Sequence, residues 1–201
     1  MLDICAAPGS KASVLLEAVF NNTINHGCII ANDAERKRIQ LMIQKVHKSG
    51  TVNLAIINHL GQFLPDVINQ NKKLLYDKIL CDAPCSGDGH IRNMPSKASA
   101  WNLKDGMIRH SLQLALLMKS LSLLKKGGIL VYSVSSTNPI ENEAVISGLF
   151  SKVSTGLEIL NVHQMIPIKA HPGMLNWSVC AMSRHRDKNC ISSIFQKKMT
   201  I

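Results

Sequence analysis

Short apolar runs alternate along the chain with longer segments in which apolar residues recur at helical spacing. The short runs place Ile, Val and Leu on consecutive positions, which is typical of strands buried on both faces of a parallel sheet. They predict strands over residues 2–6, 28–31, 52–57, 78–81 and 129–133.

The intervening segments predict helices over residues 10–21, 34–48 and 108–124. The expected inner-face residues of the first two helices are Val14, Leu15, Ala18, Val19, Ile39, Met42, Ile43 and Val46. Gly127 and Gly128 are expected to end the third helix. A fourth helix is expected to start with Asn138 as cap and Pro139 at the first position, with Glu141 reaching back to the cap.

Strict alternation of strands and helices predicts an α/β fold, a mostly parallel sheet with right-handed crossovers and helices on both faces. Ligands of such sheets bind outside the carboxyl ends of the strands. The segments to examine for chemistry are therefore residues 6–11, 32–33, 82–89 and 134–138, each of which follows an expected strand.

Composition fits one folded domain over the 201 residues, with a core over 1–160 and a basic C-terminal segment over 161–201. Hydrophobic residues make up 46% of the chain and charged residues 18%, which is typical of a globular rather than a disordered chain. The formal net charge of +10 suits a polyanionic partner such as nucleic acid.

The six cysteines lack the paired spacing of a zinc site, so no metal is expected. Cys5, Cys28 and Cys81 lie in apolar runs and are interpreted as small buried residues. Without a disulfide framework, a secretory leader or a membrane-length apolar run, we expect an intracellular monomer that does not enter a membrane.

The first loop turns sharply from a strand into a helix through small residues, which lets a ligand approach the backbone amides. It consists of Cys5, Ala6, Ala7, Pro8, Gly9, Ser10 and Lys11. Asp33 ends the next strand, where a carboxylate accepts hydrogen bonds from a ribose, although it could also cap the following helix. Together they favour an adenosine-bearing cofactor, and they do not separate S-adenosylmethionine from a nicotinamide.

The loop over residues 82–89 places the Asp82 carboxylate and the Cys85 thiol beside this expected cofactor site. A partly ionised thiol is the group needed to attack C6 of a pyrimidine and make C5 electron-rich. The alternative is a glycine-rich loop with a surface cysteine.

Three segments resemble the successive motifs of the Sun-domain RNA cytosine-5 methyltransferases: residues 3–11 (DICAAPGSK), 82–89 (DAPCSGDG) and 132–143 (YSVSSTNPIENE). The resemblance implies a Rossmann-like class I S-adenosylmethionine-dependent fold, in which Cys5 to Lys11 hold the methionine part, Asp33 holds the ribose, and Asp82 lies between cofactor and base. It is closest to the eukaryotic branch that acts on transfer RNA, which implies methylation of cytosine C5 in RNA and a nuclear or nucleolar location.

The chain departs from the family pattern at three places. Ser135 stands where the family has its nucleophilic cysteine, and a serine hydroxyl is far less acidic than a thiol. Cys85, which assists product release in the family, is a substitute nucleophile in an alternative interpretation. Leu60 replaces an aspartate on the adenine side of the cofactor, and the sheet is expected to be incomplete at both ends.

Arg184, Arg186 and Lys188 give the C-terminal segment a positive bias suited to RNA phosphates. The basic residues on the helix over 34–48 are interpreted as a solvated face. Aromatic residues are only 4% of the chain, so base stacking is not expected to dominate RNA capture. Trp101 and Trp177 are the candidates for stacking, although the core is the more usual place for each.

Three hypotheses follow. The first is S-adenosylmethionine-dependent methyl transfer to cytosine C5 in RNA, and the second is an impaired relative that still binds cofactor and RNA. The third is a nicotinamide-dependent oxidoreductase, which is disfavoured because the GxGxxG fingerprint is missing.

Overall fold

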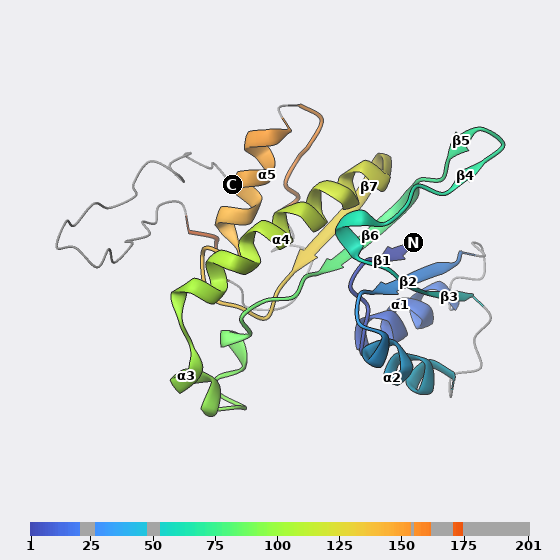
Figure 1. The fold of residues 1–201 in the computed structure, drawn as a ribbon. Coiled ribbons are helices and arrows are strands. Elements are labelled where there is room, and N and C mark those ends of the chain that lie inside the picture. The colour runs from blue at the N-terminus through green and yellow to red at the C-terminus, as the bar shows by residue number, and fades with distance from the viewer. Residues whose placement is uncertain (21–26, 48–52, 154, 162–170, 175–201) are drawn as a thin grey trace. The chain divides into compact units, whose positions relative to one another are not determined.

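A computed structural model describes residues 1–20, 27–47, 53–153, 155–161 and 171–174. The chain divides into two compact units, residues 1–85 with 111–135 and residues 86–110 with 136–201. The first unit holds a parallel five-stranded sheet in the order β3-β2-β1-β6-β7 (Figure 1). Its strands are β1 (Leu2–Asp3), β2 (Ile29–Asp33), β3 (Leu54–Asn58), β6 (Tyr76–Asp82) and β7 (Leu124–Ser133).

All five expected strands are present, and the α/β fold with a parallel sheet is confirmed. The first loop of the chain connects β1 at the centre of the sheet to a helix, and β2 and β6 pair with β1 on either side. The chain adds β2 and β3 on one side of β1 and then β6 and β7 on its other side. Such a topological switch point opens a crevice at the carboxyl ends of the strands.

Helices α1 (Ser10–Phe20) and α2 (Arg36–His47) pack against β2. Their buried residues are Ala12, Leu16, Ile39, Met42 and Val46. Val14 is 65% exposed, Ile43 is 44% exposed and Ala18 is also exposed, so three of the expected inner-face residues were wrong. In α1 the buried face is centred on Ala12 and Leu16, which belong to the same core cluster as Ile29 and Ala31 of β2.

Helix α4 (Leu103–Leu123) covers the sheet from the other side through its C-terminal half, where Leu116 lies beside Ile4 and Gly61. A Cβ on Gly61 would stand 2.7 Å from Leu116, so this position admits only glycine without a shift. The helix ends within one residue of the expected bound at Leu124, but the expected role of Gly127 and Gly128 in ending it was wrong, since β7 begins directly after Leu123. Gly127 instead has φ +76 inside β7, near a register irregularity of the β6–β7 pairing.

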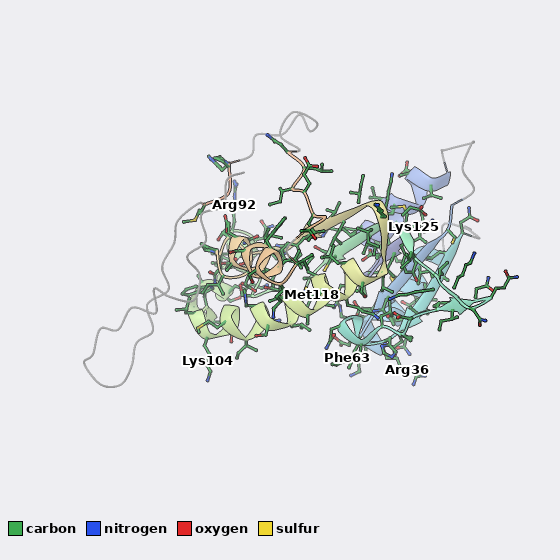
Figure 2. The ribbon with its side chains drawn as sticks, turned by 90° about the horizontal axis from the view of Figure 1, so that it is seen from above. Arg36, Phe63, Arg92, Lys104, Met118 and Lys125 are labelled. Atoms are coloured by element: carbon green, nitrogen blue, oxygen red, sulfur yellow. The ribbon has the colours of Figure 1, made fainter. Side chains whose placement is uncertain are left out.

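A hairpin of β4 (Ile68–Asn69) and β5 (Lys72–Lys73) projects from the first unit (Figure 1). Its turn residues Gln70 and Asn71 have φ 48 and 61. The sequence did not predict this hairpin, because Gln-Asn is not one of the glycine-containing pairs that mark such turns. A short 3-10 helix, η1 (Gly61–Phe63), precedes it, and the ring of Phe63 is exposed (Figure 2).

The second unit contains a 3-10 helix η2 (Asp88–His90), helix α3 (Ser96–Ala100), the start of α4, and helix α5 (Glu143–Lys152). Trp101 is 45% exposed and so does not lie in the core, its more usual place, and Arg92 and Lys104 are also exposed (Figure 2). Helix α5 begins at Glu143 rather than at Pro139. The residues from Pro139 to Asn142 form turns, and Glu141 does not reach back to cap a helix.

Candidate cofactor and active site

The first loop lies between β1 and α1 and is folded against α2. Ala6 and Ala7 are buried, the Ala7–Pro8 peptide is cis, and the Gly9 amide donates to the Ala6 carbonyl at 2.8 Å. Gly9 has φ +96, and a Cβ there would stand 2.8 Å from Cγ of Met42. Glycine is therefore required both by the backbone conformation and by the close approach of α2.

Asp33 is 3% exposed and holds this loop from the end of β2. Its Oδ2 accepts the Ala7 amide at 3.2 Å and lies 3.3 Å from the Arg38 guanidinium, while Oδ1 accepts the Glu35 amide at 2.9 Å. Arg38 also donates to the Ala7 carbonyl. A carboxylate has about four acceptor positions, so Asp33 keeps capacity for one more donor such as a ribose hydroxyl.

Arg38 was interpreted from sequence as part of a solvated basic face, and for this residue the interpretation was wrong. Lys45 of the same helix also turns toward the loop and donates to Ser10 Oγ at 2.8 Å. Both cations thus fix the first loop onto α2. In the sequence these residues are marked only by their helical spacing. That spacing predicts a basic helix face, but it does not show whether the face contacts solvent or a loop.

Asn32 is fully buried and joins the ends of three strands. Its side-chain amide donates to the carbonyls of Ile4 and His59, each at 3.0 Å, and its Oδ1 accepts the His59 amide at 3.0 Å. The sequence marked this position without giving it a role. A buried asparagine at a strand end is recognised only once its partners from other strands are known.

Lys11 and Asp82 connect the first loop with the end of β6. Their Nζ and Oδ2 atoms are 2.6 Å apart, and the other Asp82 oxygen accepts Ser133 Oγ at 2.7 Å. Asp82 and Ser133 are also register partners at the ends of the parallel strands β6 and β7. The structure therefore brings together the expected site residues Lys11 and Asp82 at one edge of the sheet.

Cys85 and Ser135 follow these two strand ends within a few residues, and both are half-buried. The two loops start side by side, since the Ala83 amide donates to the Ser133 carbonyl at 2.9 Å. Sequence reasoning placed both residues at this edge of the sheet, and their strand ends lie there.

In the second unit, Glu141 lies completely buried between Ser86 and Ser136. It accepts the Ser86 amide at 2.9 Å and the Ser136 hydroxyl at 2.8 Å, and it also accepts the Ser86 hydroxyl. Asp88 makes a second link of this kind by accepting the Thr137 amide at 2.8 Å.

Asp3, at the end of β1, is the most unusual carboxyl of the first unit. It is fully buried, and neither side-chain oxygen has a hydrogen-bond partner among the described residues. Burial raises its pKa to about 7; the nearby Asp82 and Asp33 act in the same direction, and Lys11 opposes them. No role was predicted for Asp3 beyond its place in the motif of residues 3–11.

The remaining cysteines differ in burial. Cys81 is buried, which raises the pKa of its thiol to about 12, and Cys5 is half-buried with a thiol pKa also raised by desolvation. Cys28 is exposed, so its expected burial was wrong. Cys28 lies directly before β2, which begins at Ile29. It belongs to the apolar run of the sequence but not to the strand.

Leu60 is 50% exposed in the loop after β3, which fits its place at the carboxyl edge of the sheet. Arg184, Arg186, Lys188 and Trp177 lie outside the described residues. Within the described ranges, no group of three or more His, Cys, Asp or Glu side chains could hold a metal ion. In that same part of the chain, no helix is both long and apolar enough to cross a membrane.

Residues 1–170 match the protein family described as 16S rRNA methyltransferase RsmB/F. The chain belongs to the RsmB/F family. As a member, it is 37% identical to the multisite-specific tRNA:(cytosine-C(5))-methyltransferase trm4b of Schizosaccharomyces pombe, with 89% of this chain and 30% of the relative covered. It is 38% identical to the corresponding Saccharomyces cerevisiae enzyme, with 89% and 27% covered.

A crystal structure of NSun6 from Pyrococcus horikoshii with SFG shares the fold of this RsmB/F chain, with a TM-score of 0.65 and 29% identity. The alignment covers 75% of this chain and 36% of that one. The class I methyltransferase fold and the Sun-domain resemblance are thus confirmed. The chain spans 27 to 30% of the length of these two yeast relatives.

Proposed function

We propose that this RsmB/F chain carries a site for methyl transfer from S-adenosylmethionine to C5 of cytosine in RNA, with transfer RNA as the substrate class. The observation that carries the proposal is the Lys11–Asp82 ion pair, which joins the first loop to the strand end that leads to Cys85. The relatives named as cytosine-C5 methyltransferases of transfer RNA support the reaction and the substrate class.

The residues at this edge suit the chemistry of S-adenosylmethionine. Ala6 and Ala7 add little side-chain bulk beside the start of α1, and Asp33 keeps capacity for a ribose hydroxyl. Lys11 and Asp82 offer one charge of each sign for the carboxylate and ammonium of the methionine part. In this proposal Cys5 to Lys11, Asp33 and Asp82 hold the cofactor.

When bound, S-adenosylmethionine supplies an electrophilic methyl group. The protein must make C5 of cytosine electron-rich, and a thiolate that adds to C6 does this. Asp82 is placed between the first loop and the β7 end by its contacts to Lys11 and Ser133. From there its carboxylate would orient the target base.

The nucleophile is the weak part of this site. Ser135 occupies the position of the family's cysteine, and a neutral hydroxyl needs a base to become a nucleophile. Glu141 accepts a hydrogen bond from the neighbouring Ser136 hydroxyl. Because Ser135 replaces the family's cysteine, a second candidate function is an impaired relative that binds cofactor and RNA. In this alternative, the Cys85 thiol is the remaining nucleophile for residual turnover.

RNA contact by Arg184, Arg186 and Lys188 and a nuclear or nucleolar location are parts of the same proposal. The net charge of +10 supports the RNA contact, because basic residues release counterions from phosphates. Removal of residues 181–201 should weaken RNA binding and flatten its dependence on salt. Unchanged affinity and slope would exclude these residues from the RNA site.

The deciding experiment is transfer of a labelled methyl group to unmodified transfer RNA, followed by mapping of the product to cytosine C5. Binding of S-adenosylmethionine is measured on the same protein by calorimetry. Binding without transfer supports the impaired relative, whereas absence of both would refute the proposed site.

A further inference from the structure

Glu141 is a fully buried carboxylate in the second unit whose hydrogen bonds join two segments far apart in the sequence. One oxygen accepts the Ser86 amide at 2.9 Å, and the other accepts the hydroxyls of Ser86 and, at 2.8 Å, Ser136. The carboxylate therefore binds donors that lie 55 residues before it and 5 residues before it.

The two serine donors each lie directly after a proposed nucleophile position in the sequence. Ser86 directly follows Cys85, and Ser136 directly follows Ser135. Each residue proposed as a nucleophile position is thus followed by a serine that is held by the same carboxylate.

The surrounding contacts fix the Ser136 segment further. The Asn142 side chain donates to the Ser136 carbonyl at 2.9 Å, and the Asn138 amide donates to Ser136 Oγ at 3.1 Å. Asp88 adds a second carboxylate link by accepting the Thr137 amide. Glu141 is nevertheless the one whose contacts reach the residues next to both nucleophile positions.

Burial of a carboxylate costs free energy unless hydrogen-bond donors compensate its charge. Glu141 does not serve as a helix cap, because α5 begins two residues later at Glu143. Its carboxylate is instead committed to Ser86 and Ser136. Bonds to a charged acceptor are about twice as strong as neutral ones.

We propose that Glu141 is a positioning residue that locks the segment after Cys85 to the segment after Ser135. The role rests on the proposed function, because it matters for catalysis only if these segments carry the nucleophile positions. Glutamine at this position keeps the shape but loses the charge and one acceptor, so it should release one of the two segments.

The test is a timed alkylation of the folded chain with iodoacetamide, with each cysteine read separately by mass spectrometry. Exposed Cys28 reports the reagent's activity, and buried Cys81 reports opening of the first unit's core. In Glu141→Gln, we expect the alkylation rate of half-buried Cys85 to rise by roughly fivefold, the factor for loss of one hydrogen bond. Cys81 should stay protected.

Glu143→Gln is the matched control, since it removes an equal charge two residues away, where Glu143 accepts the Met174 amide at 2.9 Å. It should leave the Cys85 rate unchanged. Ser136→Ala removes one contact with little risk to folding and should change the Cys85 rate in the same direction as Glu141→Gln. If Glu141→Gln does not fold, Ser136→Ala decides alone.

An unaltered Cys85 rate in both variants would overturn the proposal, and so would a joint rise at Cys85 and Cys81, which indicates loss of stability only. A second measurement uses the Ser135→Cys chain, in which Glu141→Gln should lower kcat for methyl transfer and leave KM for the cofactor unchanged. If Ser135→Cys shows no turnover, the proposed function fails while the alkylation result still judges Glu141.

Discussion

Lys11 and Asp82 are 71 residues apart in the sequence, and their side-chain charges meet at 2.6 Å at the carboxyl edge of the sheet. Both side chains are partly exposed, at 49% and 30%, so the pair is screened by solvent and adds little to stability. Its importance lies in joining the cofactor loop to the strand end that leads to Cys85.

Substitution of Lys11 by methionine should separate the contribution of the ion pair to stability from its contribution to cofactor binding. We expect the free energy of unfolding to fall by less than about 1 kcal/mol, as for other exposed ion pairs. Binding of S-adenosylmethionine, measured by calorimetry, should weaken about tenfold, since a charge-assisted contact is lost. Lys72→Met, in the exposed β5 strand, is the control that should change neither quantity.

Asp3 should make stability depend on pH. Its pKa is raised from the ordinary value of 3.8 to about 7, so between these values the folded state binds a proton that the unfolded chain has released. Stability should therefore fall as pH rises from about 4 to about 7 and then level off. The total change is at most roughly 4 kcal/mol, at about 1.4 kcal/mol for each pH unit.

Urea denaturation of the chain and of Asp3→Asn across this pH range measures that dependence. The asparagine side chain does not ionise, so its unfolding free energy should lose this slope and should exceed that of the unaltered chain above pH 7. Parallel curves for the two proteins would show that Asp3 ionises normally in the fold.

Leu60→Asp should strengthen cofactor binding. Leu60 is half exposed after β3, so a carboxylate is tolerated there without burial of a charge. The added hydrogen bond is worth about 1–3 kcal/mol, equivalent to a fivefold or greater fall in Kd. Leu60→Ala, which removes the same apolar surface without adding an acceptor, should leave the Kd unchanged.

Ser135→Cys should raise methyl transfer to RNA well above the very low rate expected of the unaltered chain. A thiol ionises near pH 8.5, far more readily than a hydroxyl, and is the softer nucleophile toward C6. The measurement is labelled methyl transfer at matched protein concentration. Robust turnover by the unaltered chain would contradict the assigned role of this position.

Cys85→Ser then identifies any substitute nucleophile. If residual turnover of the unaltered chain depends on the Cys85 thiol, this change should abolish it. Turnover that persists in Cys85→Ser would exclude Cys85 as nucleophile.

The strands and the two loops of the site were predictable because period and position are local signals. Consecutive Ile, Val and Leu located the buried strands, and the parallel order placed Lys11 and Asp82 at one edge. The partners of Asn32, Arg38 and Glu141 were not predictable, since each side chain bonds to residues brought near only by folding. The start of α5 was misplaced because Asn138 and Pro139 favour a helix locally, whereas the Glu141 contacts hold this segment in turns.

The hydrogen bond to Asn32 makes the His59 amide a probe of opening at this edge of the sheet. Because the one side chain of Asn32 bonds to both the carbonyl and the amide of His59 and to the Ile4 carbonyl, it links the ends of β1, β2 and β3. The His59 amide should then exchange its hydrogen for deuterium only when its bond to Asn32 opens. Its exchange rate is thus a measure of how often the rim of the cofactor site opens, and a bound cofactor would slow it without touching His59.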